Sequence, residues 1–386
     1  MRKLFRRCLA GVLAAAALTS TAFAADFTAC ADRLYEMQLF YGTDKGYDLD
    51  RVPSRAEASA MLVRLLGKEA EAQNGKYTSP FTDVPAWAKP YVGWLYQNKL
   101  TFGVGGNKFG SNDACDARMM SAFLLRTLGY AEANGDFTYA TALEFAETMG
   151  VADAVNQGTA DFTRDEMVAM SYTALSRPTK AGASSLLAEL VWEGAIDAQR
   201  AQDTLGLFAA YRTYETLMNA SAAQARETET TTVLQAGGET AHLYTLSAVD
   251  PLNRMFSTQT WEGDNVVDAS WYMNGILLTL QDGEKVWEET DFETALGERL
   301  LPISAVRDSI AFDGAVTLLC EPAAASRWMP ELGAVESMGL SVTGENGLLT
   351  EQSLYGALAS GLEFEYHTVT TATGWDVWVQ QPSILR

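Results

Sequence analysis

Histidine is nearly absent from this chain: its 386 residues include two, His242 and His367. Neither belongs to an H-E-x-x-H or H-x-x-x-H pattern, which would place two imidazoles on one helix face to bind zinc. The G-x-S-x-G turn of serine hydrolases and a phosphate-binding glycine loop are also missing. The sequence therefore predicts no metal site, no cofactor and no catalytic activity.

Basic residues are also scarce. The chain has 28 Lys and Arg against 49 Asp and Glu, which gives a formal net charge of −21. An acidic surface repels the phosphate backbone of nucleic acids, so we expect no nucleic-acid partner. We interpret the acidity as a source of solubility outside the cell.

Long apolar runs are missing except at the N-terminus. Four basic residues precede the apolar run Leu9–Leu18, and Ala22-Phe23-Ala24 offers a small-x-small cleavage site. This arrangement predicts a secretory signal peptide over residues 1–24. Its removal takes the net charge from −21 to about −25. We expect no transmembrane segment in the mature chain, because no later run is long enough to span a bilayer.

Residues 26–180 contain three degenerate copies of a helix-loop-helix unit, at about 26–68, 80–130 and 136–180. Their second halves align without gaps: RVPSRAEASAMLVRLLG, NDACDARMMSAFLLRTLG and ADFTRDEMVAMSYTALS. Two of them begin with a capping box, Ser54 with Glu57 and Thr163 with Glu166, in which hydroxyl and carboxylate bond to the exposed N–H groups of the helix start. Such units cannot bury a core alone, so we expect the copies to pack on one another.

Three segments carry a resemblance to a known family. FTDVPAWAKPYVGWLYQNKLTFGVGGNKFG, from Phe81, and the SRAE and TRDE segments at Ser54 and Thr163 resemble the S-layer homology domain. The resemblance covers about 40% of the chain. It implies an all-α prism of three copies with pseudo-threefold symmetry. It also implies grooves between copies that bind an acidic, often pyruvylated, secondary cell-wall polysaccharide.

The resemblance assigns ligand-binding residues. Arg55 and Arg164 follow the N-caps, where a guanidinium lies beside free backbone donors and the positive end of the helix dipole and suits a carboxylate. The other candidates are the caps, the loop glycines and a first-helix tryptophan: Ser54, Thr163, Gly42, Gly103 and Trp94. Alternatives stay open: the arginines could be solvated helix-start residues, the glycines helix C-caps, and Trp87 and Trp94 core residues.

The pattern of arginine and glycine is incomplete in copies two and three. Copy two has Ala117 and Met119 where the other copies have Arg and Glu, and Arg118 comes one position late, about 100° around the helix. Copy three has Ala154 in place of the glycine. We expect one or two working grooves.

Three cysteines remain after cleavage, Cys30, Cys115 and Cys320. A closed ring of three copies could bring Cys30 and Cys115 together, so a disulfide between them is one expectation and two buried thiols the other. We expect Cys320 to be a buried structural thiol.

The C-terminal part changes character. Residues 186–225 have helical periodicity and predict a connector, and residues 226–386 predict an antiparallel β-rich domain, with an Asn274-Gly275 hairpin turn and short helices at Asp291–Ala295, Pro302–Ile310 and Leu349–Ala359. Phe364 and Tyr366 alternate with polar residues, among them His367, which we expect to be exposed and inert. The strand pattern loosely resembles lipoprotein-carrier-like half-barrels, which hold helices against a concave sheet.

The fold class expected is therefore multidomain α + β. We expect a secreted protein anchored non-covalently to a bacterial cell wall or surface layer through the polysaccharide, with a non-catalytic β-rich domain and self-association in a layer. The alternatives are an envelope carrier of an apolar ligand and a wall-modifying hydrolase.

Overall fold

The computed structural model describes residues 27–44, 46–157, 161–281, 283–296, 300–312, 314–375 and 377–385. These residues form two compact units. The helical unit comprises Ala25–Phe208 and Pro302–Arg307, and the sheet unit Ala209–Leu301 and Asp308–Arg386. The predicted signal peptide lies outside the described residues. No helix in these ranges has the length and hydropathy needed to cross a membrane.

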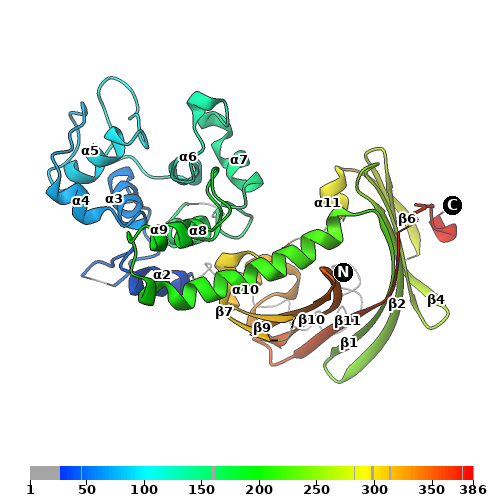
Figure 1. Ribbon diagram of the computed structural model, residues 1–386. Coiled ribbons are helices and arrows are strands. Elements are labelled where there is room, and N and C mark those ends of the chain that lie inside the picture. The colour runs from blue at the N-terminus through cyan, green and yellow to red at the C-terminus, as the bar shows by residue number, and fades with distance from the viewer. Residues whose placement is uncertain are drawn as a thin grey trace. The chain divides into compact units, whose positions relative to one another are not determined.

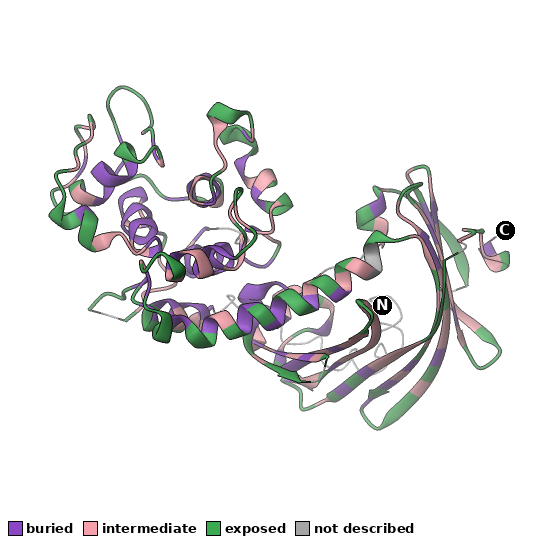
Figure 2. Cartoon of the chain, in the orientation of Figure 1, coloured by how far each residue is buried: buried purple, intermediate pink, exposed green. Residues whose placement is uncertain are grey.

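The helical unit carries three helix pairs, α2 with α3, α5 with α6 and α7 with α8 (Figure 1). Its α-helices are α2 Thr28–Glu36, α3 Arg55–Leu65, α4 Glu69–Asn74, α5 Lys89–Gln97, α6 Ala117–Thr127, α7 Ala142–Thr148, α8 Arg164–Ser176, α9 Leu186–Trp192 and the first part of α10 Ala198–Ala223; its short 3-10 turns are η1 Glu132–Asn134, η2 Tyr139–Thr141 and η3 Ile303–Ala305. The second helices of the copies, α3, α6 and α8, contact one another pairwise. Every residue of α8 from Arg164 to Leu175 is buried (Figure 2), so the unit is built around this helix.

A short segment far along the chain completes the helical unit. Turn η3 packs on α8, and Ile303 is 1% exposed. On α2, Cys30 Sγ lies 3.4 Å from the carbonyl oxygen of Ser304, and the Arg33 guanidinium donates to the carbonyl oxygen of Arg307 at 2.9 Å. The sequence predicts a helix over Pro302–Ile310, and this was wrong beyond Ala305, because β7 begins at Val306.

The sheet unit is one curved antiparallel sheet of 11 strands in the order β6-β5-β4-β3-β2-β1-β11-β10-β9-β8-β7 (Figure 1). The strands are β1 Arg226–Ala236, β2 Glu239–Asp250, β3 Met255–Glu262, β4 Asn265–Met273, β5 Ile276–Gln281, β6 Glu284–Glu289, β7 Val306–Phe312, β8 Ala315–Cys320, β9 Val335–Glu345, β10 Leu348–Leu358 and β11 Glu363–Gly374. Its helices are the later part of α10, α11 Phe292–Leu296 and α12 Pro322–Trp328, with the turns η4 Pro330–Leu332 and η5 Ser383–Leu385. An α-helical part and a large antiparallel sheet together confirm the α + β class.

Local turn chemistry was predicted well. Asn274 and Gly275 both have positive φ, 54° and 83°, and join β4 to β5 as expected for a tight hairpin. By contrast, Leu349–Ala359 is not a helix. This segment forms β10 between β9 and β11, and alternate residues Leu354 and Leu358 face the core.

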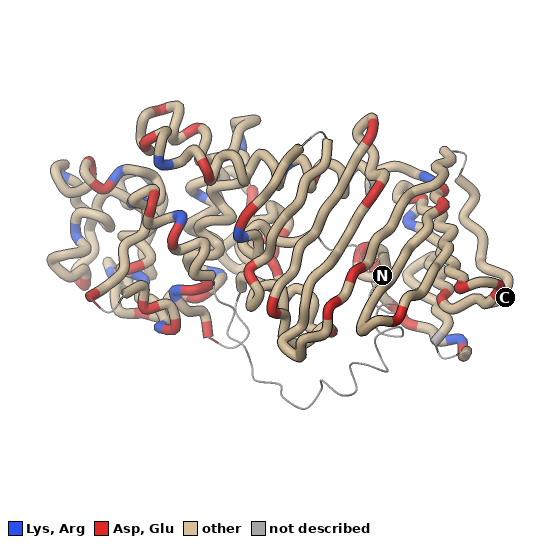
Figure 3. Tube along the Cα trace, turned by 90° about the horizontal axis from the view of Figure 1, so that it is seen from below, with Lys and Arg blue, Asp and Glu red and all other residues tan. Residues whose placement is uncertain are grey.

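Each face of the sheet carries its own apolar cluster. On the concave side, Phe292 of α11 packs on Val249, Phe256, Tyr272 and Leu277. On the convex side, Leu385 of η5 packs on Ala269, Leu278 and Leu280 (Figure 1). Acidic residues are spread over both units (Figure 3).

Candidate functional site

Two arginines at helix starts lie where one copy meets the next. The backbone N–H of Arg55, the first residue of α3, donates to the carbonyl oxygen of Asp113 in the loop of copy two, at 2.9 Å. In the same way, the N–H of Arg164, the first residue of α8, donates to the carbonyl oxygen of Arg51 in the loop of copy one, at 2.9 Å. The two junctions therefore repeat one arrangement.

The predicted capping boxes hold these helix starts in place. Ser54 accepts from the N–H of Glu57 at 3.3 Å, and Glu57 accepts from the N–H of Ser54 at 2.8 Å. Thr163 and Glu166 form the equivalent box on α8. The hydroxyls of Ser54 and Thr163 are engaged by the helix N-termini, so their part in any site is to orient the arginine that follows.

The Arg55 site is a cationic side chain enclosed by aromatic rings. Arg55 is 6% exposed, and its guanidinium carbon lies 4.9 Å from the ring centre of Phe109 and 5.3 Å from that of Phe123. One terminal nitrogen is 3.5 Å from the hydroxyl of Thr101, and Nε has no hydrogen-bond partner in the described parts of the chain. Burial lowers the pKa of this guanidinium, because the charged form loses its hydration.

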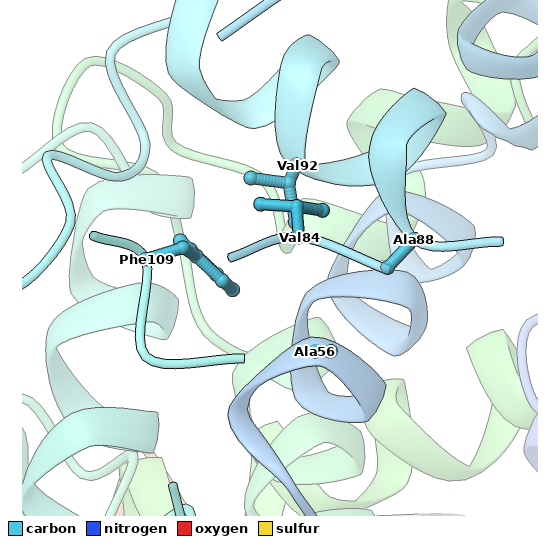
Figure 4. Packing of buried hydrophobic residues seen from close by; sticks show 5 residues of the cluster. All are labelled: Ala56, Val84, Ala88, Val92 and Phe109. Carbon is cyan, nitrogen blue, oxygen red and sulfur yellow. The ribbon is translucent and has the colours of Figure 1, made fainter. Parts of the chain in front are cut away.

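Neighbouring apolar side chains hold Phe109 in place. It packs in a cluster with Val84, Ala88 and Val92 of copy two and with Ala56, the residue after Arg55 (Figure 4). This cluster joins copies one and two and packs against the ring of Phe109. The ring in turn positions the guanidinium of Arg55.

The Arg164 site has the same design. Nε donates to the carbonyl oxygen of Tyr47 at 3.0 Å, a terminal nitrogen lies 3.5 Å from the carbonyl oxygen of Tyr41, and the guanidinium lies 5.0 Å from the ring centre of Phe40. Arg164 is also 6% exposed, and burial lowers its pKa.

The described residues place no carboxylate within salt-bridge distance of Arg55 or Arg164. Their contacts are carbonyl and hydroxyl oxygens and ring faces, which do not cancel a unit charge. A buried charge is costly unless it is paired. Both sites are therefore suited to an anionic ligand that would supply the missing counter-charge.

Two exposed aromatic residues accompany these sites, and the sequence reasoning missed them. Tyr41 and Phe102 each come one residue before the loop glycine of their copy and are 37% and 59% exposed. Arg64 lies over the ring of Tyr41 at 5.0 Å, and Arg126 lies over that of Phe102 at 5.4 Å. The aromatic-glycine pair shared by both copies is the sequence signal that could have found them.

Trp94 does not present a stacking surface. It is 6% exposed, and its indole N–H donates to a carboxylate oxygen of Glu71 at 3.0 Å. The core interpretation therefore holds for Trp94, and its assignment as a ligand residue stays a prediction. Trp87 shows the reverse: it is 52% exposed, where the sequence favours the core.

Gly42 and Gly103 are not helix C-caps. The left-handed residues after α2 and α5 are Gln38 and Lys99, with φ of 61° and 60°. A Cβ on Gly42 would lie 2.5 Å from the carbonyl oxygen of Gly46. The glycine is therefore needed for close packing of the loop backbone.

Gly103 allows a matched prediction. Its φ is +74°, and a Cβ there would lie 2.5 Å from the carbonyl oxygen of Lys108 and meet the ring of Phe81. We expect Gly103→Ala to lower the free energy of unfolding by about 2–4 kcal/mol through steric overlap and backbone strain. Gly105, with φ of +98° and open space around its Cβ position, is the control: Gly105→Ala should cost about 1 kcal/mol. Equal losses in denaturant unfolding would contradict the packing argument.

Copy two lacks an equivalent arginine site. Its helix α6 begins at Ala117 and is capped by Asp116, which accepts from the N–H of Met119 at 2.7 Å. Arg118 is exposed, as its shifted position on the helix predicts. The structure thus contains two buried arginine sites of the predicted kind in the described residues.

The structure does not join Cys30 to Cys115. Cys115 is a buried free thiol beside the Arg55 site, and burial raises its pKa to about 12. Cys30 lies instead against Ser304. The disulfide expectation is therefore corrected in favour of buried thiols, and Cys320 is buried as expected.

Asp153 introduces a pH dependence into the loop of copy three. Burial raises its pKa to about 6, against the opposing effect of hydrogen bonds from the N–H groups of Val155 and Asn156. A folded-state pKa above the unfolded value means that the folded protein loses stability as pH rises from about 4 to about 6. Asp153→Asn keeps an acceptor oxygen and removes the charge, so it should stabilise the protein by about 3 kcal/mol at pH 7 and by almost nothing at pH 4. Thermal melts at both pH values test this; an equal effect at both would contradict the assignment.

His367 is half-buried and hydrogen-bonded, where the sequence favours an exposed side chain. Its Nδ1 lies 2.7 Å from the Ser353 hydroxyl, and its Nε2 lies 3.2 Å from a carboxylate oxygen of Glu351. These are the residue types of a hydrolase triad. However, Ser353 lies inside β10, which pairs with strands on both sides, so the backbone N–H groups of the ladder are not aimed together at one point to stabilise an oxyanion. In addition, the described residues contain no group of three or more His, Cys, Asp or Glu placed to hold a metal ion.

Comparisons with known proteins give limited similarity. No protein-family model matches the chain. A cell surface protein of Thermoanaerobacter kivui is 29% identical over 156 residues, which are 39% of this chain and 20% of that protein. The match therefore spans about a fifth of the relative's length.

Solved structures also show some likeness. The lipoprotein LppX of Mycobacterium tuberculosis is 11% identical, with 45% of this chain and 98% of that chain covered and a TM-score of 0.27. A DUF1329 family protein from Desulfovibrio piger is 10% identical, with 46% and 98% covered and a TM-score of 0.26. An outer membrane lipoprotein-sorting protein domain from Vibrio parahaemolyticus is 6% identical, with 45% and 95% covered and a TM-score of 0.24.

Proposed function

We propose that this chain is a secreted cell-envelope protein that attaches non-covalently to the cell wall by binding an acidic secondary wall polysaccharide at the Arg55 and Arg164 sites. The observation that carries the proposal is the pair of buried guanidiniums, equivalent in two copies, that have no carboxylate partner among the described residues. A carboxylate on a sugar would complete the charge at each site. The exposed rings of Tyr41 and Phe102, near the same loops, would pack on sugar faces.

The resemblance of the repeats to the S-layer homology domain supports this proposal, as does the name of the Thermoanaerobacter kivui relative. The sheet unit would then be a non-catalytic module displayed at the wall. A hydrolase is less well supported, because the Ser353, His367 and Glu351 arrangement lacks convergent oxyanion donors. A carrier of apolar ligands is less well supported because hydroxyl groups line part of the concave sheet face.

The test uses the full mature chain, because the helical unit includes Pro302–Arg307 and cannot be cut from the rest without losing core. Purified walls of Thermoanaerobacter kivui are mixed with the protein and pelleted, before and after the walls are stripped of secondary polysaccharide. We expect the protein to pellet with intact walls and at least tenfold less with stripped walls, as an order-of-magnitude expectation. Equal pelleting with both kinds of wall, or with neither, would remove the proposal.

A further inference from the structure

A row of hydroxyl side chains crosses the sheet. The strand register places Thr228 of β1 opposite Ser247 of β2, Ser247 opposite Thr258 of β3, and Thr258 opposite Ser270 of β4. We call these four residues the hydroxyl row. At about 4.8 Å between neighbouring strands, the row extends for about 14 Å.

The hydroxyl row lies on the concave face. Side chains two residues apart on a strand share a face, so Thr258 shares the face of Phe256, and Ser270 that of Tyr272. Both aromatic residues belong to the cluster under α11, which lies on the concave side of the sheet (Figure 1). The row therefore runs beside the buried apolar cluster that α11 covers on the concave face.

The row differs from its neighbours in having unused hydrogen-bonding capacity. In the adjacent row, Thr245 and Thr260 bond to each other at 2.9 Å, and in the row after it Thr232 bonds to Thr368 at 2.8 Å. The four hydroxyls of the row have no partner among the described residues, and all four side chains are half-buried. They therefore remain open to water or to a ligand.

These hydroxyls limit what the concave face can bind. An alkyl chain laid over them would remove water without replacing its hydrogen bonds, which would weaken binding roughly fivefold to a hundredfold for each hydroxyl covered. The row itself carries no charge, so it offers no counter-ion to a charged ligand. A ligand with many hydroxyl groups, each donor and acceptor, fits such a row.

We propose that the hydroxyl row is a binding site for a neutral oligosaccharide lying across strands β1 to β4. The site is separate from the two arginine sites, so it goes beyond the proposed wall anchor and does not depend on it. The ligand's hydroxyls replace the water on the row. The concave face is then a glycan site and not an apolar cradle.

The test measures binding of chitohexaose and cellohexaose by calorimetry, with a dansyl-labelled fatty acid as the apolar rival. Thr258→Val and Ser247→Ala are the variants, alone and combined. Valine is favoured in strands and alanine is small enough to add no steric overlap, so the fold should persist, which circular dichroism checks. Thr231→Val, on the opposite face of β1, is the matched control. We expect at least one hexaose to bind, with affinity reduced about tenfold or more in the double variant and unchanged in Thr231→Val.

The same titrations on the arginine variant Arg55→Met/Arg164→Met separate the two kinds of site. The affinity of this variant for the hexaoses should be unchanged. The proposal is overturned if neither hexaose binds the wild-type chain, if the arginine variant loses the binding, or if the double variant binds both probes as the wild type does. Tighter binding of the fatty acid to the wild type than of either hexaose would also overturn it, in favour of the apolar carrier.

Discussion

Replacing Arg55 and Arg164 together with methionine should abolish pelleting with intact walls and leave the protein at least as stable as the wild type. The substitutions remove the two guanidiniums that are proposed to bind the carboxylates of the ligand. Two charge-assisted contacts, at about 1.5–3 kcal/mol each, correspond to at least a hundredfold loss of affinity. Stability should hold because methionine fills a similar volume, packs well against Phe109 and Phe40, and removes two desolvated charges. We expect the free energy of unfolding to rise by about 1 kcal/mol.

The matched control is Arg118→Met on α6. Arg118 is exposed and lies one position after the equivalent helix residue in copy two. Its substitution should change neither pelleting nor stability by a measurable amount. Wall pelleting and denaturant unfolding are measured on the same preparations. If the double variant unfolds more easily and still pellets, the arginines are structural and the polysaccharide sites lie elsewhere.

The second large effect is expected at Ile303. This side chain is 1% exposed within the helical unit, in the turn that packs on α8. Ile303→Ala should lower the free energy of unfolding of that unit by about 3–4 kcal/mol, because the lost carbon atoms leave a cavity between the turn and α8. Hydrogen exchange followed by mass spectrometry should show faster exchange in α2 and α8.

Ile310 provides the control seven residues further on. It is 60% exposed, so Ile310→Ala should change stability by less than about 0.5 kcal/mol. If both variants lose the same stability, or if exchange increases in the sheet and not in α2 and α8, then the turn does not complete the helical unit.

Features set by neighbouring residues could be predicted from the sequence. The capping boxes at Ser54 and Thr163 and the turn at Asn274-Gly275 were predicted correctly, because a few neighbouring residues determine each of them. The buried arginines could be singled out because the repeat marks their positions twice. Their surroundings could not: Phe109 and Phe123 approach Arg55 only after copies one and two have packed.

Errors arose where distant partners decide the structure. Leu349–Ala359 has leucines and alanines that suit a helix as well as a strand, and pairing with β9 and β11 decides in favour of the strand. Likewise, nothing near Pro302–Arg307 in the sequence indicates that it belongs with helices that end about a hundred residues earlier. Trp94 lies on α5, which packs on α4, and its indole N–H bonds to Glu71 of α4, another pairing that periodicity does not reveal.

The position of Pro302–Arg307 has a consequence for how the chain is made. On the proposed route of export the N-terminus emerges first, so α2 and α8 reach the far side of the membrane while the turn that covers them is still behind, with all of Ala209–Leu301 between. Until that stretch has followed, the surface on α8 stays open and exposed to proteases and to other chains. On that proposed route, the final folding of the first half of the protein is timed by the arrival of its second half.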